Sequence, residues 1–401
     1  MKIKNLLVCL TVLMLLNCSE EEVLSTHSIP LVAMNSEETG IFFLNQLVYQ
    51  SDINILEYLY YYNGGGVAVG DINNDGEIDL LTTDMTPEDH YRSKTNMASM
   101  STERFESLVK AGAHRQYMSN ALQVNTGSGS FSDIANMVGL SSTDWSWASL
   151  LVDLDNDGWK DIIISNGIKK DVDNNDYRSV LNKLNAKTTA EELYQLSKDA
   201  PSQPVSNYAF RNKGGLQFEK VSKKWGFDTP SFSSGMAYGD LDNDGDLDIV
   251  INNMEQPAFV YENKAVGNFL KIKLKGANKN KFGFGAKAII HHNSKLQIAE
   301  NTITRGFFSS VEPGLFFGLG KDIKVKMVEV IWPDGKVNYF ENVSANKTIT
   351  AYYSKAKLKI KEPVEIETLL SKIDAIDIGL DYIHKENEFN DFKEEILLPH
   401  K

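Results

Sequence analysis

One alternation of apolar and polar segments occurs three times along the chain. In each copy a run of small and apolar residues leads into an acidic loop of nine residues, and a second apolar run follows. The runs before the loops are residues 65–70, 147–152 and 235–239, and those after them are residues 80–82, 162–164 and 249–251. Short runs rich in Val, Ile and Leu favour strands over helices. The pattern therefore predicts three β-hairpins, each with an acidic loop at its turn.

A second phrase recurs after each hairpin. Asn120–Asn125, a Gly-rich turn and Phe131 match Asn207–Asn212, a Gly-rich turn and Phe218, and Ala258–Asn263 is a shortened third copy. Strand-like segments separated by a Gly-rich turn are typical of a second hairpin. The unit that repeats is therefore a pair of hairpins, as in a four-stranded propeller blade.

The distance between loops is larger than one blade needs. A propeller blade takes about 40–50 residues, whereas the loops at Asp71, Asp153 and Asp240 start 82 and 87 residues apart. Residues 96–117 and 178–199 account for the excess, because their apolar residues have helical spacing. We therefore expect helical insertions between the two hairpins of a blade.

The acidic loops share the spacing of a cation site. Side-chain oxygens fall at positions 1, 3, 5 and 9, Gly stands at position 6, and the position-7 residue can add its backbone carbonyl, which together suit calcium. The expected ligands are Asp71, Asn73, Asp75, Glu77 and Asp79 in the first loop, Asp153, Asp155, Asp157, Trp159 and Asp161 in the second, and Asp240, Asp242, Asp244, Asp246 and Asp248 in the third. Ordinary solvated turns are the alternative for any single loop. Three copies favour calcium, because so many oxygens at close range repel one another without a cation.

Composition indicates a packed protein and argues against nucleic acid as a partner. The chain has 401 residues, of which 42% are hydrophobic, which gives room for two or three domains. Its formal charge is −13, and no basic stretch stands out that would neutralise phosphates.

The N-terminus has the pattern of an export signal. Lys2 and Lys4 precede a short apolar core, Leu6–Leu16, which is too short to span a bilayer. Cys18 and the acidic run behind it resemble the lipobox and surface-export signal of lipoproteins of Bacteroidetes-type bacteria. The resemblance implies lipidation of Cys18 and display on the outer membrane, and a cleaved signal with an incidental Cys18 is the alternative. The only other cysteine is Cys9, so no disulfide is expected.

The repeats resemble FG-GAP/VCBS repeats, the blade unit of integrin α-subunits. From Asn268 the chain resembles the ASPIC/UnbV domain, through the phrases Asn268–Gly276, Gly283–Ala288, Arg305–Ser310, Phe317–Gly320, Val330–Gly335 and Glu341–Val343. The resemblance implies an all-β protein with helical insertions, in which a partial integrin-α-like β-propeller precedes a small β-sandwich-like domain. Propellers of this kind usually close with about seven blades, and only three acidic loops are present here.

These observations give the expected boundaries: signal peptide 1–18, tether 19–40, propeller blades 41–265, ASPIC/UnbV domain 266–354, and a linker or the start of a further region 355–401. The aromatic run 41–62 is expected to be sheet core.

Several other residues suggest chemistry of their own. Trp145 and Trp147 are expected on one strand face in the core, whereas Trp159 could stack on a sugar or peptide. The cluster Asp171–Asp176 lacks the loop glycine and is expected to be a solvated loop. His291 and His292 should face opposite sides of a strand, which argues against a zinc site. Signatures of hydrolase, nucleotide-binding or metalloprotease sites are absent from the sequence.

The favoured hypothesis is a non-catalytic, calcium-binding surface lipoprotein that acts in adhesion or binds an extracellular glycan or protein. The alternatives are the scaffold part of an extracellular polymer-degrading enzyme and a structural subunit of an outer-membrane uptake complex.

Overall fold

The computed structural model describes residues 31–39, 66–96, 102–112, 117–185, 187–292, 295–359 and 375–379. The predictions for the signal peptide, Cys18, the aromatic run 41–62 and most of the tail lie outside these residues. The chain divides into two units, Met1–Leu358 and Lys359–Lys401. In the second unit the structure describes a single 3-10 turn, η2 (Ala375–Ile378).

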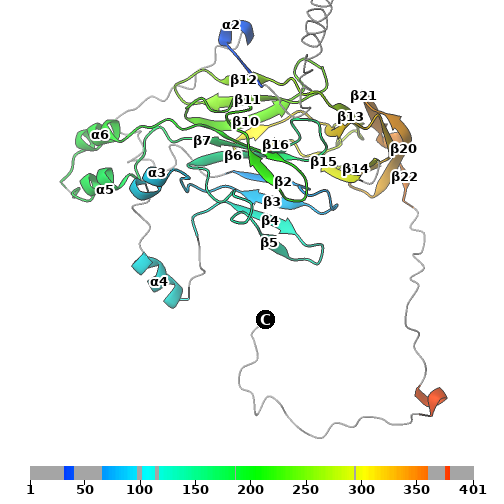
Figure 1. Ribbon diagram of the computed structural model, residues 1–401, viewed down its shortest axis with the longest axis horizontal. Helices are drawn as coiled ribbons and strands as arrows, with labels where there is room; N and C mark the ends of the chain where they lie inside the picture. Colours follow the sequence, from blue (N-terminus) through cyan, green and yellow to red (C-terminus); the bar gives the residue numbers. More distant parts are fainter. Residues whose placement is uncertain are drawn as a thin grey trace, which may run out of the picture. The chain divides into compact units, whose positions relative to one another are not determined.

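Three four-stranded antiparallel sheets form the propeller blades (Figure 1). The first blade contains β2 (Val67–Gly70), β3 (Asp79–Thr82), β4 (Ala121–Asn125) and β5 (Phe131–Asp133). The second contains β6 (Ser146–Val152), β7 (Asp161–Asn166), β8 (Tyr208–Asn212) and β9 (Phe218–Lys220). The third contains β10 (Ser233–Gly239), β11 (Asp248–Asn253), β12 (Phe259–Glu262) and β1 (Val32–Met34). Each acidic loop joins the first two strands of a blade, which confirms the predicted hairpins.

The outermost strand of the third blade comes from the N-terminal side of the chain. β1 pairs antiparallel with β12, in the register Val32 with Glu262 and Met34 with Val260. Residues 32–34 fall in the segment expected to be a tether, so part of that segment is a blade strand. Leu31 explains the difference, because its side chain is buried in the core beside the third blade. A short helix, α2 (Ser36–Thr39), follows β1.

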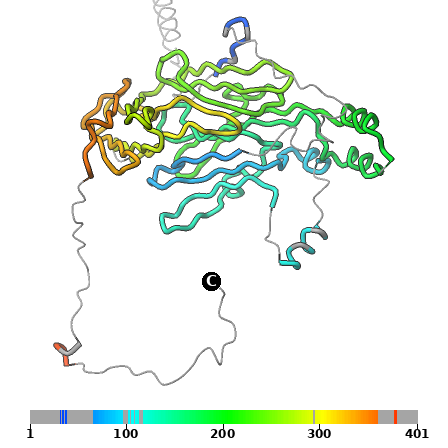
Figure 2. Tube along the Cα trace, turned by 180° about the vertical axis from the view of Figure 1, so that it is seen from behind, coloured from blue at the N-terminus to red at the C-terminus, as the bar shows by residue number. Residues whose placement is uncertain are grey.

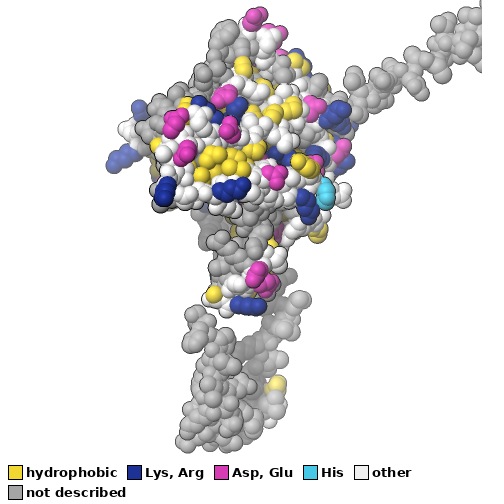
Figure 3. All heavy atoms as spheres, turned by 90° about the vertical axis from the view of Figure 1, so that its left-hand side faces the viewer, with side chains coloured by type: hydrophobic (Ala, Val, Ile, Leu, Met, Phe, Trp, Pro, Cys, Tyr) yellow, Lys and Arg dark blue, Asp and Glu magenta, His cyan; other side chains and the backbone are white. Residues whose placement is uncertain are grey.

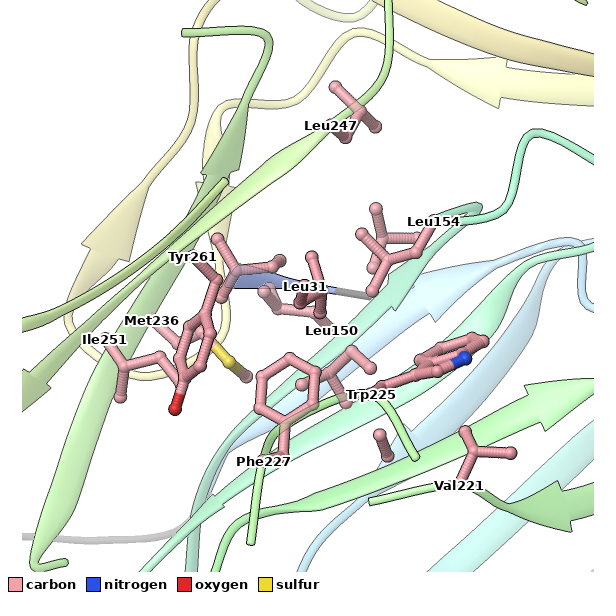
Figure 4. Close-up of a cluster of buried hydrophobic side chains, with 14 of the residues drawn as sticks. Leu31, Leu150, Leu154, Val221, Trp225, Phe227, Met236, Leu247, Ile251 and Tyr261 are labelled. Carbon is pink, nitrogen blue, oxygen red and sulfur yellow. The ribbon is translucent and has the colours of Figure 1, made fainter. Parts of the chain in front are cut away.

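Adjacent blades pack face to face, and in the described part of the chain two large apolar cores and one smaller cluster, around Trp147 and Phe232, lie between them. The core between the second and third blades contains Leu150, Trp225, Phe227, Met236 and Tyr261 (Figure 4). A second core, which includes Ile72, Leu81 and Leu122, lies between the first and second blades. β6 and β7 are buried at every position. A strand that is covered on both faces shows no alternation of apolar and polar residues. This explains why the sequences of β6 and β7 lack that alternation.

The insertions are helical, as predicted. α3 (His90–Thr95) and α4 (Thr102–Lys110) lie between β3 and β4, and α5 (Asn175–Leu181) and α6 (Ala190–Asp199) lie between β7 and β8. The sequence explains where α6 begins, because Thr189 and Glu192 form a reciprocal capping box. No helix among the described residues is long and apolar enough to cross a membrane.

The C-terminal domain is a small β-sandwich. One sheet has the order β18 (Leu315–Gly320), β13 (Asn268–Lys275), β21 (Lys347–Tyr352). The other has the order β15 (Lys295–Glu300), β14 (Lys287–His292), β19 (Lys324–Ile331), β20 (Lys336–Ser344), β22 (Lys357–Leu358), and a 3-10 turn, η1 (Tyr353–Lys355), precedes β22. Leu270, Ile290 and Phe317 are among the residues of its core. His292 is buried and the side chain of His291 is 40% exposed, so the two histidines do face opposite sides of β14.

A hairpin of the C-terminal domain reaches the innermost strands of the blades. It consists of β16 (Thr304–Arg305) and β17 (Ser309–Ser310). Gly306 forms a bridge with Val67 of the first blade, and the Met236 backbone N–H of the third blade donates to Ser309 Oγ at 3.0 Å. The Phe307 ring packs 5.1 Å from that of Trp147 in the second blade. The tube in Figure 2 follows this connection from the domain into the propeller.

Candidate metal centres

The three acidic loops have the same backbone conformation. The fourth residue is left-handed in each, with φ of 56° at Asn74, 54° at Asn156 and 64° at Asn243. The sixth residue is a glycine with φ of 93°, 89° and 98° in the three loops. Asn tolerates the left-handed region better than most residues, and Gly enters it at no steric cost. The sequence pattern therefore fixes one loop geometry three times.

The aspartate at position 9 of each loop accepts hydrogen bonds that connect the loop to the rest of its blade. Asp79, Asp161 and Asp248 each accept a hydrogen bond from the backbone N–H of position 2, at 2.8, 3.0 and 2.8 Å. Their second oxygens accept from the backbone N–H of the asparagine that ends the third strand: Asn125, Asn212 and Asn263, at 2.9, 2.9 and 2.8 Å. The asparagine itself is accounted for by its side chain, because Nδ2 of each donates to the position-8 carbonyl of the loop: Ile78, Lys160 and Leu247, at 3.4, 3.0 and 3.0 Å.

Carboxylates gather most closely in the second and third loops. Among the described residues, one carboxylate oxygen each of Asp153, Asp155 and Asp161 lie within 4.8 Å of one another. The same holds for Asp240, Asp242 and Asp244. The first loop has Asn73 at position 3, and its amide donates to Asp75 Oδ2 at 2.8 Å. Among the described residues, three carboxylates therefore come together in the second and third loops, whereas the first loop, with one carboxylate fewer, does not bring three together.

Most carboxylates of the second loop are buried away from solvent. Burial, and then the neighbouring Asp157 and Asp155, raise the pKa of Asp153 well above its usual value, and burial raises that of Asp161 likewise. Burial and Asp155 raise the pKa of Asp157 to about 6. In the third loop, burial and Asp244 raise the pKa of Asp246 to about 7. Carboxylates in this arrangement need a compensating positive charge, and a divalent cation is one that can supply it.

Among the expected ligands of the second loop, one buried oxygen has no hydrogen-bond partner in the described part of the chain. Asp155 is 5% exposed, and its Oδ1 makes no hydrogen bond among the described residues. Buried polar atoms are almost always satisfied, so an orphan of this kind points to a group that the site is built to receive. The residues of the second loop therefore fit a cation.

Asparagine side chains connect each loop to the neighbouring blade. The Asn74 amide donates to the Gly158 carbonyl at 2.8 Å, and the Asn156 amide donates to the Gly245 carbonyl at 3.0 Å. In the opposite direction, Asn212 Nδ2 donates to the Ile72 carbonyl and Asn263 Nδ2 to the Leu154 carbonyl, both at 2.8 Å. The loops thus form a hydrogen-bonded chain from one blade to the next.

Three basic side chains that sequence reasoning missed lie beside the loops. Arg211 donates from Nε to Asp155 Oδ2 at 2.5 Å and from Nη2 to Asp157 Oδ2 at 2.9 Å. Lys160 Nζ lies 3.4 Å from the Ile298 carbonyl, and Lys271 Nζ lies 3.5 Å from Asp240 Oδ2. Burial lowers the pKa of Lys160, and the nearby Asp71 and Asp153 act in the opposite direction. One signal was available, because Arg211 stands where the other two copies of the phrase have Val124 and Glu262.

The C-terminal domain lies directly on the second and third loops. A Cβ added at Gly318 would lie 2.0 Å from Asp153 Oδ2, and one added at Gly245 would lie 1.9 Å from the Phe269 ring. The Gly320 N–H donates to the Asn156 carbonyl at 2.6 Å. The motif glycines of β18 therefore serve a close approach to the second loop.

Two side chains differ from the sequence interpretation. Trp159 is half-buried: a Cβ added at Gly214 would lie 2.9 Å from its ring, and the Lys295 ammonium lies 5.2 Å from the ring centroid, so part of the ring surface expected for stacking is in contact with the protein. Asp171, expected in a solvated loop, is 3% exposed and accepts a hydrogen bond from the Asn96 amide. This contact was not predictable from the sequence, because the partner residues are 75 positions apart.

Comparison with protein families confirms both sequence resemblances. A family model of the FG-GAP-like repeat matches residues 111–164 and 199–251, and a model of the ASPIC and UnbV domain matches residues 276–358. The second and third acidic loops lie inside the repeat matches. The first lies outside them, and its backbone geometry identifies it as a third copy.

Curated relatives share both parts of the chain. Cartilage acidic protein 1 is 25% identical in Xenopus tropicalis and in Homo sapiens, over 322 and 321 residues, and 24% identical over 284 residues in Mus musculus. These alignments cover 77%, 76% and 69% of this chain but 40%, 38% and 34% of the relatives. The chain therefore spans about two fifths of the length of the relatives it matches.

Proposed function

We propose that this chain, which is built from FG-GAP-like repeats and an ASPIC and UnbV domain, is a non-catalytic surface protein whose propeller is stabilised by calcium. In this proposal each acidic loop holds one ion, and the blade surfaces bind an extracellular glycan or protein. The observation that carries the proposal is one loop geometry in three copies, with clustered carboxylates in two of them, which are buried in the second loop. Oxygen-rich sites of this type suit a hard cation.

Residues of the three acidic loops are the proposed ligands, and their position within the blades gives the ion a structural role. The carboxylates at positions 1, 3, 5 and 9 are its ligands, together with Asn73 in the first loop, and the position-7 carbonyls of Glu77, Trp159 and Asp246 are expected to complete the shell. A bound ion neutralises charges that repel one another, so it stabilises the folded state by mass action. The role is structural, since the loops connect strands of the blades.

Metal content tests the assignment loop by loop. Purified protein should retain three calcium ions per chain, and Asp242→Ala should retain two, because Asp242 supplies position 3 of the third loop. Asp176→Ala, an exposed carboxylate outside the loops, is the matched control and should retain three. Elemental analysis after dialysis measures the ratio. Equal calcium content in parent and Asp242→Ala would contradict the assignment.

Thermal unfolding tests the structural role. The melting temperature should fall by many degrees in excess chelator and recover when calcium is restored. A ligand at about 1,000 times its dissociation constant contributes about 4 kcal/mol to stability. An unchanged melting temperature in chelator, with no ion retained, would overturn the calcium proposal.

A lipid on Cys18 is the proposed means of attachment to the outer membrane. Labelling of cells with a fatty-acid analogue should mark the parent and Cys9→Ser but not Cys18→Ser. Cys9 is the matched control because it lies within the leader that export removes. Equal labelling of both variants would contradict anchoring through Cys18.

Ligand binding is tested with glycan and protein arrays. We expect binding with calcium and its loss in chelator, because the blades that carry the binding surface lose their loops' ions. An array without any binding partner in the presence of calcium would count against adhesion or ligand capture.

A further inference from the structure

The C-terminal domain carries a charge opposite to that of the whole chain. Residues 266–358 contain 15 Lys and Arg and six Asp and Glu, a formal charge of +9, whereas the complete chain has −13. Strong charge asymmetry between parts of a chain indicates an interaction with an anionic partner. On the face of the molecule seen in Figure 3, by contrast, acidic and basic side chains are interspersed.

Only part of the positive charge contacts the propeller, through Lys271 and Lys295. Lys271 is buried and is paired with Asp240 and Glu312. The next lysines along β13, Lys273 and Lys275, are exposed, and neither forms a salt bridge with a described carboxylate. They alternate with Leu270, Ile272 and Leu274, whose side chains are in the domain's core. β13 therefore presents Lys273 and Lys275 on the outer face of its sheet, away from that core.

The turn that follows β13 extends this face with two more lysines and two aromatic rings. Lys279, Lys281 and Phe282 are exposed, and Phe282 and Phe284 are 56% and 38% exposed. Their ring centroids lie 5.7 Å apart. Exposed phenylalanines are costly in water, because about 25 cal/mol is lost for each Å² of apolar surface left unburied. Two of them on one turn mark an interaction surface.

Hydrogen bonds fix the turn in the conformation that exposes the rings. Asn280 Nδ2 donates to the Phe284 carbonyl and the Phe284 N–H donates to Asn280 Oδ1, both at 2.8 Å. Asn301 Nδ2 holds the Phe282 carbonyl at 2.8 Å, and the Gly276 N–H donates to the Lys281 carbonyl at 3.0 Å. The last contact brings the end of β13, and with it Lys275, beside Lys281. The lysines and the rings therefore belong to one pre-organised surface.

We propose that this basic-aromatic face, formed by Lys273, Lys275, Lys279, Lys281, Phe282 and Phe284, binds the surface of an anionic lipid bilayer. Lysines attract anionic headgroups, and aromatic rings enter the region just below them. Phenylalanine favours lipid over a charged polysaccharide, since its ring has no hydrogen-bonding group for sugar hydroxyls. The acidic remainder of the chain does not prevent docking, because salt screens charges beyond about 8 Å at physiological ionic strength.

The test compares vesicle binding of full-length variants at constant calcium. Vesicles contain phosphatidylcholine alone or phosphatidylcholine with phosphatidylglycerol, and bound protein is measured by sedimentation at low and high salt. The variants are Lys273→Gln, Lys275→Gln, Lys279→Gln and Lys281→Gln combined, and Phe282→Ser with Phe284→Ser. The matched control combines Lys183→Gln, Lys187→Gln, Lys223→Gln and Lys224→Gln, which removes four exposed lysines elsewhere. All keep the same N-terminal segment, so its contribution cancels, and equal melting temperatures establish that each variant is folded.

We expect binding of the parent and of the control to increase strongly with phosphatidylglycerol and to fall at high salt. The quadruple lysine variant should lose about 100-fold in partitioning to anionic vesicles, and the double phenylalanine variant about tenfold. Equal binding of the lysine variant and its control would overturn the proposal. Binding to soluble dextran sulfate that needs the four lysines, without any phosphatidylglycerol-dependent vesicle binding, would overturn it in favour of a polysaccharide.

Discussion

Asn74 combines two tasks that are separate in most turns. Its backbone is left-handed, with φ of 56°, and its side-chain amide donates across to the Gly158 carbonyl of the next blade. A left-handed residue with a side chain costs about 1–2 kcal/mol unless it is Asn or Asp. The residue type is therefore set by the loop and by the neighbouring blade together.

Two substitutions at Asn74 separate the tasks. Asn74→Gly removes only the inter-blade hydrogen bond and should lower the free energy of unfolding by about 1 kcal/mol. Asn74→Ala also places a Cβ-bearing residue in the left-handed region and should cost about 1 kcal/mol more. Urea denaturation at saturating calcium measures both. Equal effects of the two variants would show that the backbone conformation contributes nothing.

Asp171 gives the protein a defined pH dependence outside the acidic loops. Its carboxylate is buried with Asn96 and lies 3.7 Å from Arg92, which is itself paired with Asp144 at 2.7 Å. Burial raises the pKa of Asp171 to about 6 although Arg92 lowers it. The folded state therefore holds this proton more tightly than the unfolded state, in which the pKa is near 3.8.

The sign of the effect follows from linkage. As the pH rises from about 4 to about 6, the unfolded state loses the proton first, so the contribution of Asp171 to stability falls and then stays constant. Asp171→Asn removes this penalty, so its stability relative to the parent should improve by up to about 2–3 kcal/mol between pH 4 and pH 7. Urea denaturation at both pH values, with exposed Asp176→Asn as control, measures the difference. A parent–variant difference that is the same at both pH values would rule out this pKa.

At the scale of elements, β1 is the fourth strand that completes the third blade. The edge of β12 would otherwise present unpaired backbone groups, which are a liability for aggregation. Leu31 anchors the strand, with 6% exposure, whereas the adjacent Val32 is 42% exposed. We therefore expect burial of the Leu31 side chain to contribute most of the free energy that holds β1 on the third blade.

Substitutions at these neighbours should differ sharply. Leu31→Ala leaves a cavity beside Tyr261 and its neighbours and should cost about 2–4 kcal/mol. Val32→Ala, which loses a mostly exposed side chain, should stay within about 0.5 kcal/mol of the parent. Equilibrium denaturation compares them, and hydrogen exchange at β12 reports whether the strand has detached. Normal protection of β12 in Leu31→Ala would mean that backbone pairing alone holds β1.

The sequence predicted the elements whose signals are local. The hairpins, the helical insertions and the loop geometry follow from residues close together in the chain, such as Asn156 and Gly158. The contacts of Arg211 with Asp155, of Asn96 with Asp171 and of Gly318 with Asp153 were not predictable, because they join residues 56, 75 and about 165 positions apart. β1 was missed because a three-residue strand has too little periodicity to stand out from a polar segment.

At the scale of the molecule, we expect the proposed cation binding and the attachment of the C-terminal domain to be linked. β18 lies against the second loop through Gly318 and Gly320, and Lys271 reaches Asp240 of the third loop. An ion that orders these loops also orders the surface on which the domain rests. The two processes therefore stabilise each other by the same free energy.

Hydrogen exchange measures this link directly. Chelation of calcium should raise the exchange rate of β18 as well as that of the second loop. Gly318→Ala should do the same with calcium present and should cost at least about 1–3 kcal/mol, because its Cβ would overlap Asp153. The control is Gly239→Ala, whose Cβ would meet only Leu241 at an ordinary 3.6 Å. Unchanged exchange of β18 in chelator would show that the domain does not sense the loops.

The pairing of Val32–Met34 with Val260–Glu262 also sets an order of events for a chain that is synthesised from its N-terminus. The strand that emerges earliest has no partner until more than two hundred further residues have followed it. During that interval Leu31 remains in water, and the nascent protein offers a short adhesive segment to any holdase that accompanies it. The third blade can then be completed only after β12 has been synthesised, in a late step that joins the two distant segments.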